Sequence, residues 1–574
     1  MNRRHRHKML LIILFISGLI KGSHAQSRYD SSFFEVAKRN MENLVVFTDR
    51  SLYAVNESIQ FSAFLQFGEE AYYGPGSKVL YAELVNSFGT SVAKGKFLIT
   101  ENRSSGHLAV PSSSLSGIYY LRCYTRWMRN FGPRYFAYVP IRVVNPYSED
   151  ILANNTVQGK GYLTPFPKGA EKVAASLDRH SYHVGEMVDV ELSLKEGSID
   201  QVHYGCITVV PSGTIDTSAF IHSLDSSPEG SIPFQFNFLP ERKGTTLSGI
   251  VLEHSNQEPA SDTRIHFSIL GEEPAYFVTL TDKEGRFQVN TPTRSGYQEM
   301  FVVPEYEPGT IIDVLIDNDF TSEPLPYDPD SFNLSHDEQL QASRLSLHMQ
   351  LHQVFLAESG VDSATVPDRA GHEPIYGTPE ISVKIDEYIN LPNMEEIIVN
   401  LIPKTNLKQS GGQVHIMIEN ENPMISMFPP LILIDDIPVP DMDVFLAIPP
   451  SKIDRINVIP EVYVFGEVKY GGIISITSLE GDLASIKLPD GSYFFDYAAY
   501  HPQLIPQASR YPGLAKIPDT RNTLFWMDHL ELRKDSSRKV SFRTAGVPGS
   551  YIILFRGISS DGDIVHGLNY FNVE

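Results

Sequence analysis

A nine-residue phrase occurs twice in this chain, 129 residues apart. Residues 49–57 read DRSLYAVNE, and residues 178–186 read DRHSYHVGE. Each copy precedes an alternation of apolar and polar residues, over 59–65 and 188–194, that is typical of a strand with one buried face. Self-similarity at the spacing of a small domain indicates two copies of one module. With 11% aromatic residues, 40 Gly and 38 Pro, the composition favours short strands and frequent turns. The predicted fold class is therefore mainly β, with Ig-like sandwiches in series.

The repeated phrase resembles the opening of the second macroglobulin domain in alpha-2-macroglobulin-like proteins. In the first copy the resemblance continues through 78–84 and 115–122 to a last strand near Val144. It implies macroglobulin-like β-sandwiches at 44–146 and 165–241. The motif residues that carry it are Asp49, Arg50, Tyr53, Glu57, Asp178, Arg179, Tyr182, Gly185 and Glu186. The Cys-Gly-Glu-Gln thioester run of the protease-trapping family members is missing from the sequence, so covalent capture of a protease is not expected.

A third sandwich is predicted at 242–317. A strand at 246–251, a turn near Pro259 and the phrase at 281–287 resemble the carboxypeptidase-regulatory-like domain, a name that denotes a fold and implies no peptidase. Asp282 and Gly285 read as turn residues rather than calcium ligands. A Pro-rich linker follows, and Ser335 with Glu338 forms a capping box for a helix at 335–357 within the segment 318–374. This helix is expected to pack against a neighbouring domain. Another short helix is expected at 26–43.

The segment 430–477 resembles the plug of TonB-dependent receptors, in particular those of the Bacteroides group. It runs from an apolar strand into an acidic turn, then through a Pro-Pro segment to a glycine-rich strand. The residues that match are Asp435, Pro438, Ile453, Gly466, Tyr470, Gly471 and Gly472. The resemblance implies a small α+β plug-like domain at 375–490, with Asp435 stabilising its turn through backbone contacts. The position of Asp435 and Asp436 at a strand end favours a solvated turn over a functional pair of carboxylates. A further macroglobulin-type sandwich is expected at 491–574.

A plug normally sits inside a barrel of about 22 strands, each of about 9–11 residues. Fewer than 100 residues follow Ser478, and they lack a series of alternating ten-residue strands. We therefore expect that this chain does not build a barrel around its own plug-like domain.

The amino terminus is predicted to be a secretion signal at 1–25. Arg3, Arg4, Arg6 and Lys8 precede an apolar core at 9–20, and Ala25 ends a plausible cleavage site. The net charge of −22 argues against nucleic acid or anionic lipid as a partner. Export to the periplasm or the outer membrane is expected, with secretion as the second choice; Cys123 and Cys206 are expected to be buried free thiols.

No catalytic, metal or cofactor site is predicted. His348 and His352 are four residues apart on the expected helix, but Met349 stands where a zinc peptidase needs Glu and no third ligand is indicated. A Gly-x-Ser-x-Gly elbow and a phosphate-binding loop are absent from the sequence. The chain is therefore expected not to be an enzyme.

The predicted function is a docking or accessory protein of the outer membrane, associated through protein contacts and engaging an envelope partner such as a barrel protein. Two alternatives stay open. One is a macroglobulin-like protease-binding or defence protein without a thioester, with the linker at 318–335 as the exposed bait. The other is a glycan- or peptide-binding module that uses aromatic residues such as Tyr72, Tyr73 and Trp127.

Overall fold

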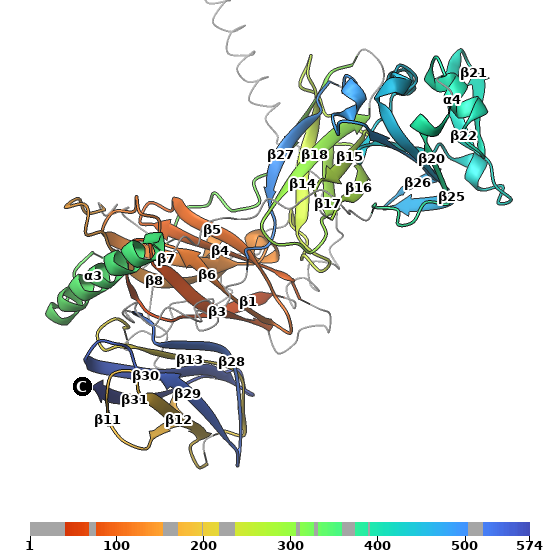
Figure 1. Ribbon diagram of the computed structural model, residues 1–574. Coiled ribbons are helices and arrows are strands. Elements are labelled where there is room, and N and C mark those ends of the chain that lie inside the picture. The colour runs from red at the N-terminus through yellow and green to blue at the C-terminus, as the bar shows by residue number, and fades with distance from the viewer. Residues whose placement is uncertain are drawn as a thin grey trace, which may run out of the picture.

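The computed structural model describes residues 41–67, 76–152, 170–197, 199–216, 236–271, 273–305, 310–326, 331–358, 374–388, 391–488, 490–502 and 521–574. Strands in these residues form three β-sandwiches and a smaller α+β unit (Figure 1), which confirms the mainly-β prediction. The expected signal at 1–25 and nearly all of the expected helix at 26–43 lie outside the described residues. Glu42 and Asn43, at the end of that helix prediction, instead begin a strand.

The first sandwich has a three-stranded sheet, in the order β1-β3-β6, against a five-stranded sheet, in the order β2-β8-β7-β4-β5. Its strands are β1 (Glu42–Thr48), β2 (Leu52–Ala54), β3 (Ser58–Phe67), β4 (Val79–Asn86), β5 (Ser91–Leu98), β6 (Arg103–Ala109), β7 (Gly117–Tyr124) and β8 (Ala137–Val144). The alternation expected after the first phrase is present, since Ile59, Phe61 and Ala63 of β3 point into the core. Large aromatic side chains fill that core, Tyr81 and Tyr120 among them.

The second sandwich is assembled from two distant parts of the chain, which corrects the sequence prediction. Sandwiches were expected separately at 165–241 and 491–574, but their strands share two sheets, in the orders β10-β12-β29 and β11-β31-β30-β13-β28, with β9 beside β31. The strands are β9 (Ala170–Glu171), β10 (Val173–Leu177), β11 (Ser181–Tyr182), β12 (Met187–Leu194), β13 (Gln201–Pro211), β28 (Phe525–Arg533), β29 (Ser537–Arg543), β30 (Gly549–Ser559) and β31 (Ile564–Val573). Everything between β13 and β28 is thus an insertion into one sandwich. Strand β13 of the earlier segment pairs with both β28 and β30 of the later segment, so the two segments complete one sheet together.

The third sandwich also recruits a late strand. Its sheets run β17-β14-β19 and β16-β15-β18-β27. The strands are β14 (Thr246–Glu253), β15 (Arg264–Ile269), β16 (Ala275–Leu280), β17 (Arg286–Asn290), β18 (Tyr297–Glu305), β19 (Ile312–Ile316) and β27 (Tyr493–Ala498). The last of these lies in the segment expected to belong to the C-terminal sandwich, and it closes the edge of β18 instead.

The smaller unit, called here the plug-like unit, has a mixed sheet in the order β20-β25-β26-β23-β24. The strands are β20 (Ile381–Lys384), β23 (Leu431–Ile434), β24 (Ile437–Pro438), β25 (Ile453–Phe465) and β26 (Val468–Ser478), with a separate hairpin of β21 (Thr405–Ser410) and β22 (Gln413–Ile418). Helices α4 (Met394–Asn400) and α5 (Met442–Leu446) pack on its apolar face. The unit is therefore α+β, as the sequence predicted.

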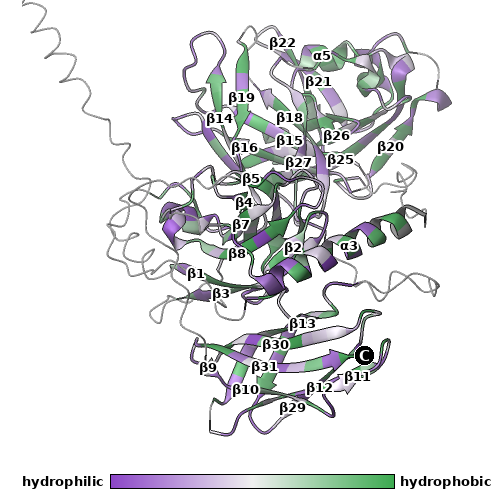
Figure 2. Cartoon of the chain, turned by 90° about the vertical axis from the view of Figure 1, so that its left-hand side faces the viewer, coloured by the Kyte–Doolittle hydropathy of each residue, from purple (hydrophilic) through white to green (hydrophobic). Residues whose placement is uncertain are grey.

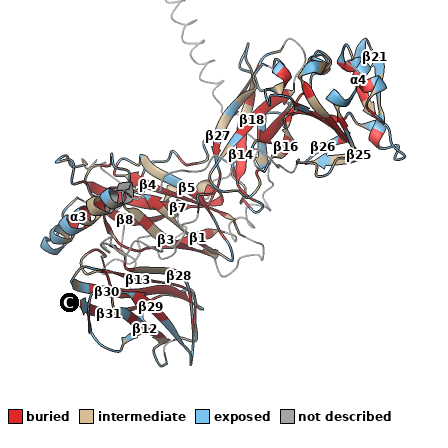
Figure 3. Ribbon diagram, viewed as in Figure 1, coloured by how far each residue is buried: buried red, intermediate tan, exposed pale blue. Residues whose placement is uncertain are grey.

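The helix expected at 335–357 is α3 (His336–Glu358), and it packs against the first sandwich. Ser335 and Glu338 bond reciprocally at its start, as in a capping box. Ala342, Leu345 and Met349 join the core of the first sandwich, whereas the opposite side of the helix faces solvent (Figure 3). None of the helices in the described residues is long and apolar enough to cross a membrane.

An apolar interface joins the first and second sandwiches. Val45, Phe47 and Phe64 from β1 and β3 pack against Cys206 and Val210 of β13 and against Ile552, Leu554 and Ile558 of β30. These side chains lie on the outer faces of their sheets, where an isolated sandwich would be polar. Figure 2 shows the two sandwiches stacked on each other, with the plug-like unit at the far end of the molecule.

Gly471 in β26 is predicted to be intolerant of a side chain. A Cβ there would lie 2.0 Å from the carbonyl oxygen of Ile425 and 2.3 Å from that of Phe428, because the chain crosses directly over the strand. We expect Gly471→Ala to lower the free energy of unfolding by about 1–3 kcal/mol through overpacking against backbone, measured by urea titration. Lys469→Ala, on the exposed part of the same strand, is the control. An unchanged unfolding midpoint for Gly471→Ala would contradict the close approach.

Candidate functional site

The two copies of the repeated phrase fold into the same hydrogen-bonded turn. In the first, the Tyr53 hydroxyl donates to Asp49 Oδ1 at 2.6 Å and Arg50 binds both carboxylate oxygens of Glu57, at 2.9 and 3.2 Å. In the second, the Tyr182 hydroxyl donates to Asp178 and Arg179 pairs with Glu186. Each arginine also lies over the tyrosine ring of its own copy, at 4.4 and 4.7 Å. The side-chain hydrogen bonds and the ion pair within each phrase therefore stabilise the turn that precedes the long strand.

The first copy is buried in the joint between two sandwiches. Arg50 is 3% exposed and Asp49 is fully buried. Thr523, just before β28 of the second sandwich, donates to Asp49 Oδ2 at 2.5 Å and accepts from Arg50 Nε at 3.0 Å. Asn522 donates to Glu57 at 2.7 Å. Burial acts to lower the pKa of Arg50. The electrostatic contacts with Glu57 and Asp49 outweigh this effect and raise the pKa above the usual range.

The second copy faces solvent. Arg179 is 48% exposed, and the outer face of its sheet carries ion-paired or hydroxyl side chains such as Asp189, Lys539 and Ser541. The outer face of the corresponding sheet of the first sandwich carries Val45, Phe47 and Phe64. One copy of the phrase thus lies in a buried joint and the other in a solvent-exposed turn, and the side chains around each copy make this difference. Gly185 has a φ of 74° with open space around it, which fits the turn that the sequence indicated.

The residues of the plug motif are gathered around one sheet. Asp435 accepts from the backbone N–H groups of Ser478 and Leu483, both at 2.9 Å, and from the Ser478 hydroxyl at 2.6 Å. It has a φ of 47°, so these contacts hold a left-handed turn between β23 and β24. Gly466 turns the chain between β25 and β26, and Gly472 accompanies a bulge with a φ of 99°. Ile453 and Pro438 are buried strand residues.

Tyr470 fixes the plug-like unit to the third sandwich. Its hydroxyl lies 2.9 Å from that of Tyr276 in β16, and both rings belong to an apolar cluster with Leu431, Leu433 and Ile473. Ser268 of β15 donates to the carbonyl oxygen of Asp436 at 2.8 Å. Burial raises the pKa of Tyr470 to about 12, so the hydroxyl remains a neutral hydrogen-bonding group at physiological pH.

Other residues singled out in the sequence lie in structural settings. His348 Nδ1 is 2.7 Å from Asn522 Oδ1, which places this histidine in the joint between the sandwiches; the side chain of His352 is outside the described residues. Asp282 accepts from the N–H groups of Glu284 and Arg286 in its turn. Cys123 and Cys206 are buried free thiols, and burial raises the pKa of both. Among described residues, no cluster of three His, Cys, Asp or Glu side chains could hold a metal ion.

Two of the sites named for the alternative functions differ from expectation. Trp127 is 4% exposed and stacks on Phe236, so it is not an exposed aromatic platform; Tyr72 and Tyr73 lie outside the described residues. The linker at 318–335 was expected to be an exposed bait. Its described part is instead anchored, because Arg122 donates to the carbonyl oxygens of Glu323 and Thr321, and Phe320 and Leu325 join the first core.

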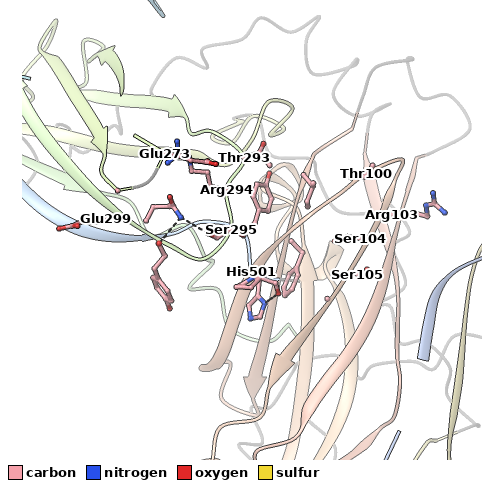
Figure 4. Close-up of a pocket in the computed structure, with 18 of the residues that line it drawn as sticks. Thr100, Arg103, Ser104, Ser105, Glu273, Thr293, Arg294, Ser295, Glu299 and His501 are labelled. Carbon is pink, nitrogen blue, oxygen red and sulfur yellow. Dashed lines mark hydrogen bonds between the residues drawn. The ribbon is translucent and has the colours of Figure 1, made fainter. Parts of the chain in front are cut away.

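A cleft of about 1010 Å³ lies between the first and third sandwiches and reaches the edge of the second (Figure 4). Strand β6 and the end of β5 form one wall, the turns before β16 and β18 form the other, and Tyr500 to Pro502 run between them. The His501 ring stacks on Phe97 at 5.1 Å and meets His107 edge-on at 4.6 Å. The chain segment at Tyr500 bridges both walls, pairing with Lys96 and with Ser295.

The Arg, Lys, Asp and Glu residues that line the cleft are two arginines, Arg103 and Arg294, and two glutamates, Glu273 and Glu299. Arg103 pairs with Glu101 at 2.6 Å, and His529 lies 3.2 Å from Asp528. The guanidinium of Arg294 is partly desolvated, which lowers its pKa, while the charge of Glu273 opposes that shift. The remaining lining is largely hydroxyl and aromatic side chains, with Tyr297 79% exposed. The arrangement can bind a neutral polar ligand, and it contains no activated nucleophile among the described residues.

Sequence reasoning missed this cleft because its residues come from turns and linkers hundreds of positions apart. Arg103, Arg294, His501 and His529 share no motif and no periodicity. The only local signal is a clustering of short hydroxyl residues at 103–105 and 293–295, which is common in any turn.

Comparison with known proteins gives limited information. No protein-family model matches the chain, and no curated protein matches it. Among solved structures, an alpha-2-macroglobulin from Salmonella reacted with methylamine is 9% identical, with 93% of this chain and 39% of that chain covered and a TM-score of 0.23. A trypsin-activated alpha-2-macroglobulin from Escherichia coli is 9% identical, with coverages of 96% and 43% and a TM-score of 0.22. Dimeric latent PorU from Porphyromonas gingivalis is 10% identical over 48% of this chain and 34% of its own, with a TM-score of 0.16.

The structures that this chain resembles thus include bacterial alpha-2-macroglobulins, and the chain spans less than half of their length. At these TM-scores the likeness supports no conclusion about arrangement or function. The carboxypeptidase-regulatory and plug resemblances have no match among the family models.

Proposed function

We propose that this chain is an exported, non-enzymatic docking protein that presents its plug-like unit to an envelope partner, of which an outer-membrane barrel protein is the leading candidate. The observation that carries the proposal is the position of this unit. It lies at the end of the molecule opposite the second sandwich, held by Tyr276–Tyr470 and by the apolar cluster around them (Figure 1).

Rigid attachment matters because a domain that swings on a linker loses more entropy on binding than one that is already fixed. The plug-like unit is fixed at two points of its sheet, since Asp436 bonds Ser268 and Ile437 packs on Phe301 and Val303 of β18. The third sandwich is fixed in turn to the first, where Arg126 donates to Thr246 and Ser248 of β14. The modules therefore form a continuous support for the distal end.

The distal unit also exposes apolar side chains. Met427 is 71% exposed and Val464 is 60% exposed, and the turn at Ile425–Met427 contacts β25 and β26. Lys469 lies 5.7 Å from the ring of Phe428 nearby. Methionine suits a protein-binding surface because its flexible side chain adapts to the partner. These residues are the ones on which we expect a partner to pack.

The test is affinity capture from an outer-membrane fraction with the tagged full-length protein and its Met427→Lys variant. We expect the unmodified protein to recover a barrel protein and the variant to recover at least about tenfold less, because a charge would be buried in the contact. Leu347→Lys is the matched control, since Leu347 is another exposed apolar residue (55%), on α3 and far from the unit. Recovery of no membrane protein, or equal recovery by both variants, would contradict the proposal.

A further inference from the structure

Among the described strands, β6 has a partner on one of its edges only, and its other edge lines the cleft. It pairs with β3 on one side and is the last strand of its sheet. Its first residue, Arg103, exchanges backbone hydrogen bonds with Thr100 across the preceding turn, at 2.9 and 2.8 Å. Both backbone groups of Arg103 therefore point away from β3.

In an antiparallel pair, the backbone N–H and C=O groups of successive residues point alternately towards the partner strand and away from it. Ser104 turns its N–H and C=O towards Ala63 of β3, and Ser105 turns both groups away, towards the cleft. Within the described ranges of the chain, Ser105 takes part in none of the backbone hydrogen bonds made outside the strand ladders. Ser105 thus offers one donor and one acceptor, spaced as in a strand, on the wall of a cavity. An exposed pair of this kind is a template for one more strand.

The cleft has the dimensions and the charge for such a strand. The β6 residues on its wall, Arg103 to Gly106, extend for about 13 Å at the rise of a β-strand. Its volume of about 1010 Å³ lies at the upper end of the range for ligand sites. Because its two lining arginines are matched in number by two glutamates, Glu273 and Glu299, the walls do not select a strongly charged ligand. Tyr297, 79% exposed, and the His501 ring, which stacks on the buried Phe97, offer aromatic surfaces to the side chains of an added strand.

We propose that this cleft binds an extended, uncharged segment of a partner polypeptide, which adds to the edge of β6 through the backbone of Ser105. Main-chain hydrogen bonds provide the affinity and the aromatic walls provide selectivity, as in other cases of strand addition. The site is separate from the plug-like unit, so it stands or falls independently of the docking role proposed above. A glycan, which could also use the hydroxyl and aromatic walls, would not need the N–H of Ser105.

The experiment uses the intact protein and a random seven-residue peptide library. Peptides selected on the immobilised protein are labelled with fluorescein, and their affinities are measured by fluorescence anisotropy for three forms of the protein. Ser105→Pro removes the free N–H but leaves the pairing of β6 with β3 untouched, since that N–H does not face β3. Ser105→Ala removes only the hydroxyl and is the matched control.

We expect selected peptides to bind the unmodified and Ser105→Ala proteins alike, and to bind Ser105→Pro at least tenfold more weakly. Circular dichroism and the melting temperature establish that Ser105→Pro is folded; if it is not, methylation of single amides in the peptide tests the same hydrogen bonds from the ligand side. Equal binding to Ser105→Pro, or indifference to amide methylation, would overturn the proposal. So would a failure to select peptides together with binding on a glycan array.

Discussion

Replacing Arg50 by Ala is expected to destabilise the protein by about 3–5 kcal/mol. Arg50 is 3% exposed and neutralises Asp49, fully buried, and Glu57, 10% exposed. Its removal leaves two carboxylates without their cation in a site closed to water, which is far more costly than the loss of an exposed pair. Because Thr523 and Asn522 of the second sandwich bond to the same carboxylates, the joint is expected to open as well.

The repeat provides the matched control. Arg179 occupies the same place in the second phrase, with the same tyrosine beneath it and the same glutamate seven residues on, but it is 48% exposed. Arg179→Ala is expected to change stability little, because water replaces the lost contacts. Urea unfolding followed by tryptophan fluorescence reports on both modules, since Trp127 lies beside the first sandwich and Trp526 in β28 of the second. If Arg50→Ala and Arg179→Ala lowered the free energy of unfolding equally, burial of the first phrase would not explain the effect of Arg50→Ala.

Raising the pH from about 4.5 to about 7 is expected to weaken the joint between the first and third sandwiches. Glu241 lies buried there: its Oε1 accepts from the Thr246 N–H at 2.6 Å and from the Tyr81 hydroxyl at 3.1 Å. Its Oε2 has no hydrogen-bond partner among the described residues. Burial raises the pKa of this carboxyl from 4.5 to about 7, although the charge of Arg126 acts in the opposite direction. Asp319 adds to the increase in the pKa.

The direction in which stability changes with pH follows from the number of protons bound in the folded and the unfolded state. Between these two pH values the folded protein keeps a proton on Glu241 that the unfolded chain has released, so stability falls as pH rises. Its contribution is complete below about pH 4.5 and is lost as pH passes the folded pKa of about 7, a change of the order of 3 kcal/mol. Glu241→Gln resembles the protonated form and should remove this dependence.

The measurement is the free energy of unfolding at pH 5 and pH 8 for the unmodified protein and for Glu241→Gln. The comparison is needed because burial also raises the pKa of Glu42, which gives a dependence of the same sign in both proteins. At pH 8 we expect Glu241→Gln to have a higher free energy of unfolding than the unmodified protein. At pH 5 we expect this difference to become smaller or to change sign. A difference independent of pH would mean that Glu241 ionises freely in the folded state.

Local features were predictable from the sequence where neighbouring residues decide them. The capping box at Ser335 rests on contacts between residues three positions apart, and it is present. The turn at Asp435 is present as well, but the backbone groups that hold it belong to Ser478 and Leu483, more than 40 positions along the chain. The phrase at 49–57 was correctly predicted to be a turn entering an alternating strand, because the hydrogen bonds that close this turn join residues at most eleven positions apart. Its bonds to Asn522 and Thr523 could not be predicted in this way. The residues that line the cleft carry no such local pattern.

The mainly β class, the alternation within the strands and several of the turns follow from local sequence, since backbone preference and the period of two act within a few residues. Which strands share a sheet does not follow from local sequence. Strands β13 and β28 are more than 300 residues apart, and each alone reads as the start or end of a different sandwich. Pairing partners are chosen by the apolar face that each strand must cover, and that choice is made among all strands of the chain at once. The same competition placed one copy of the repeated phrase in a buried joint and left the other in water.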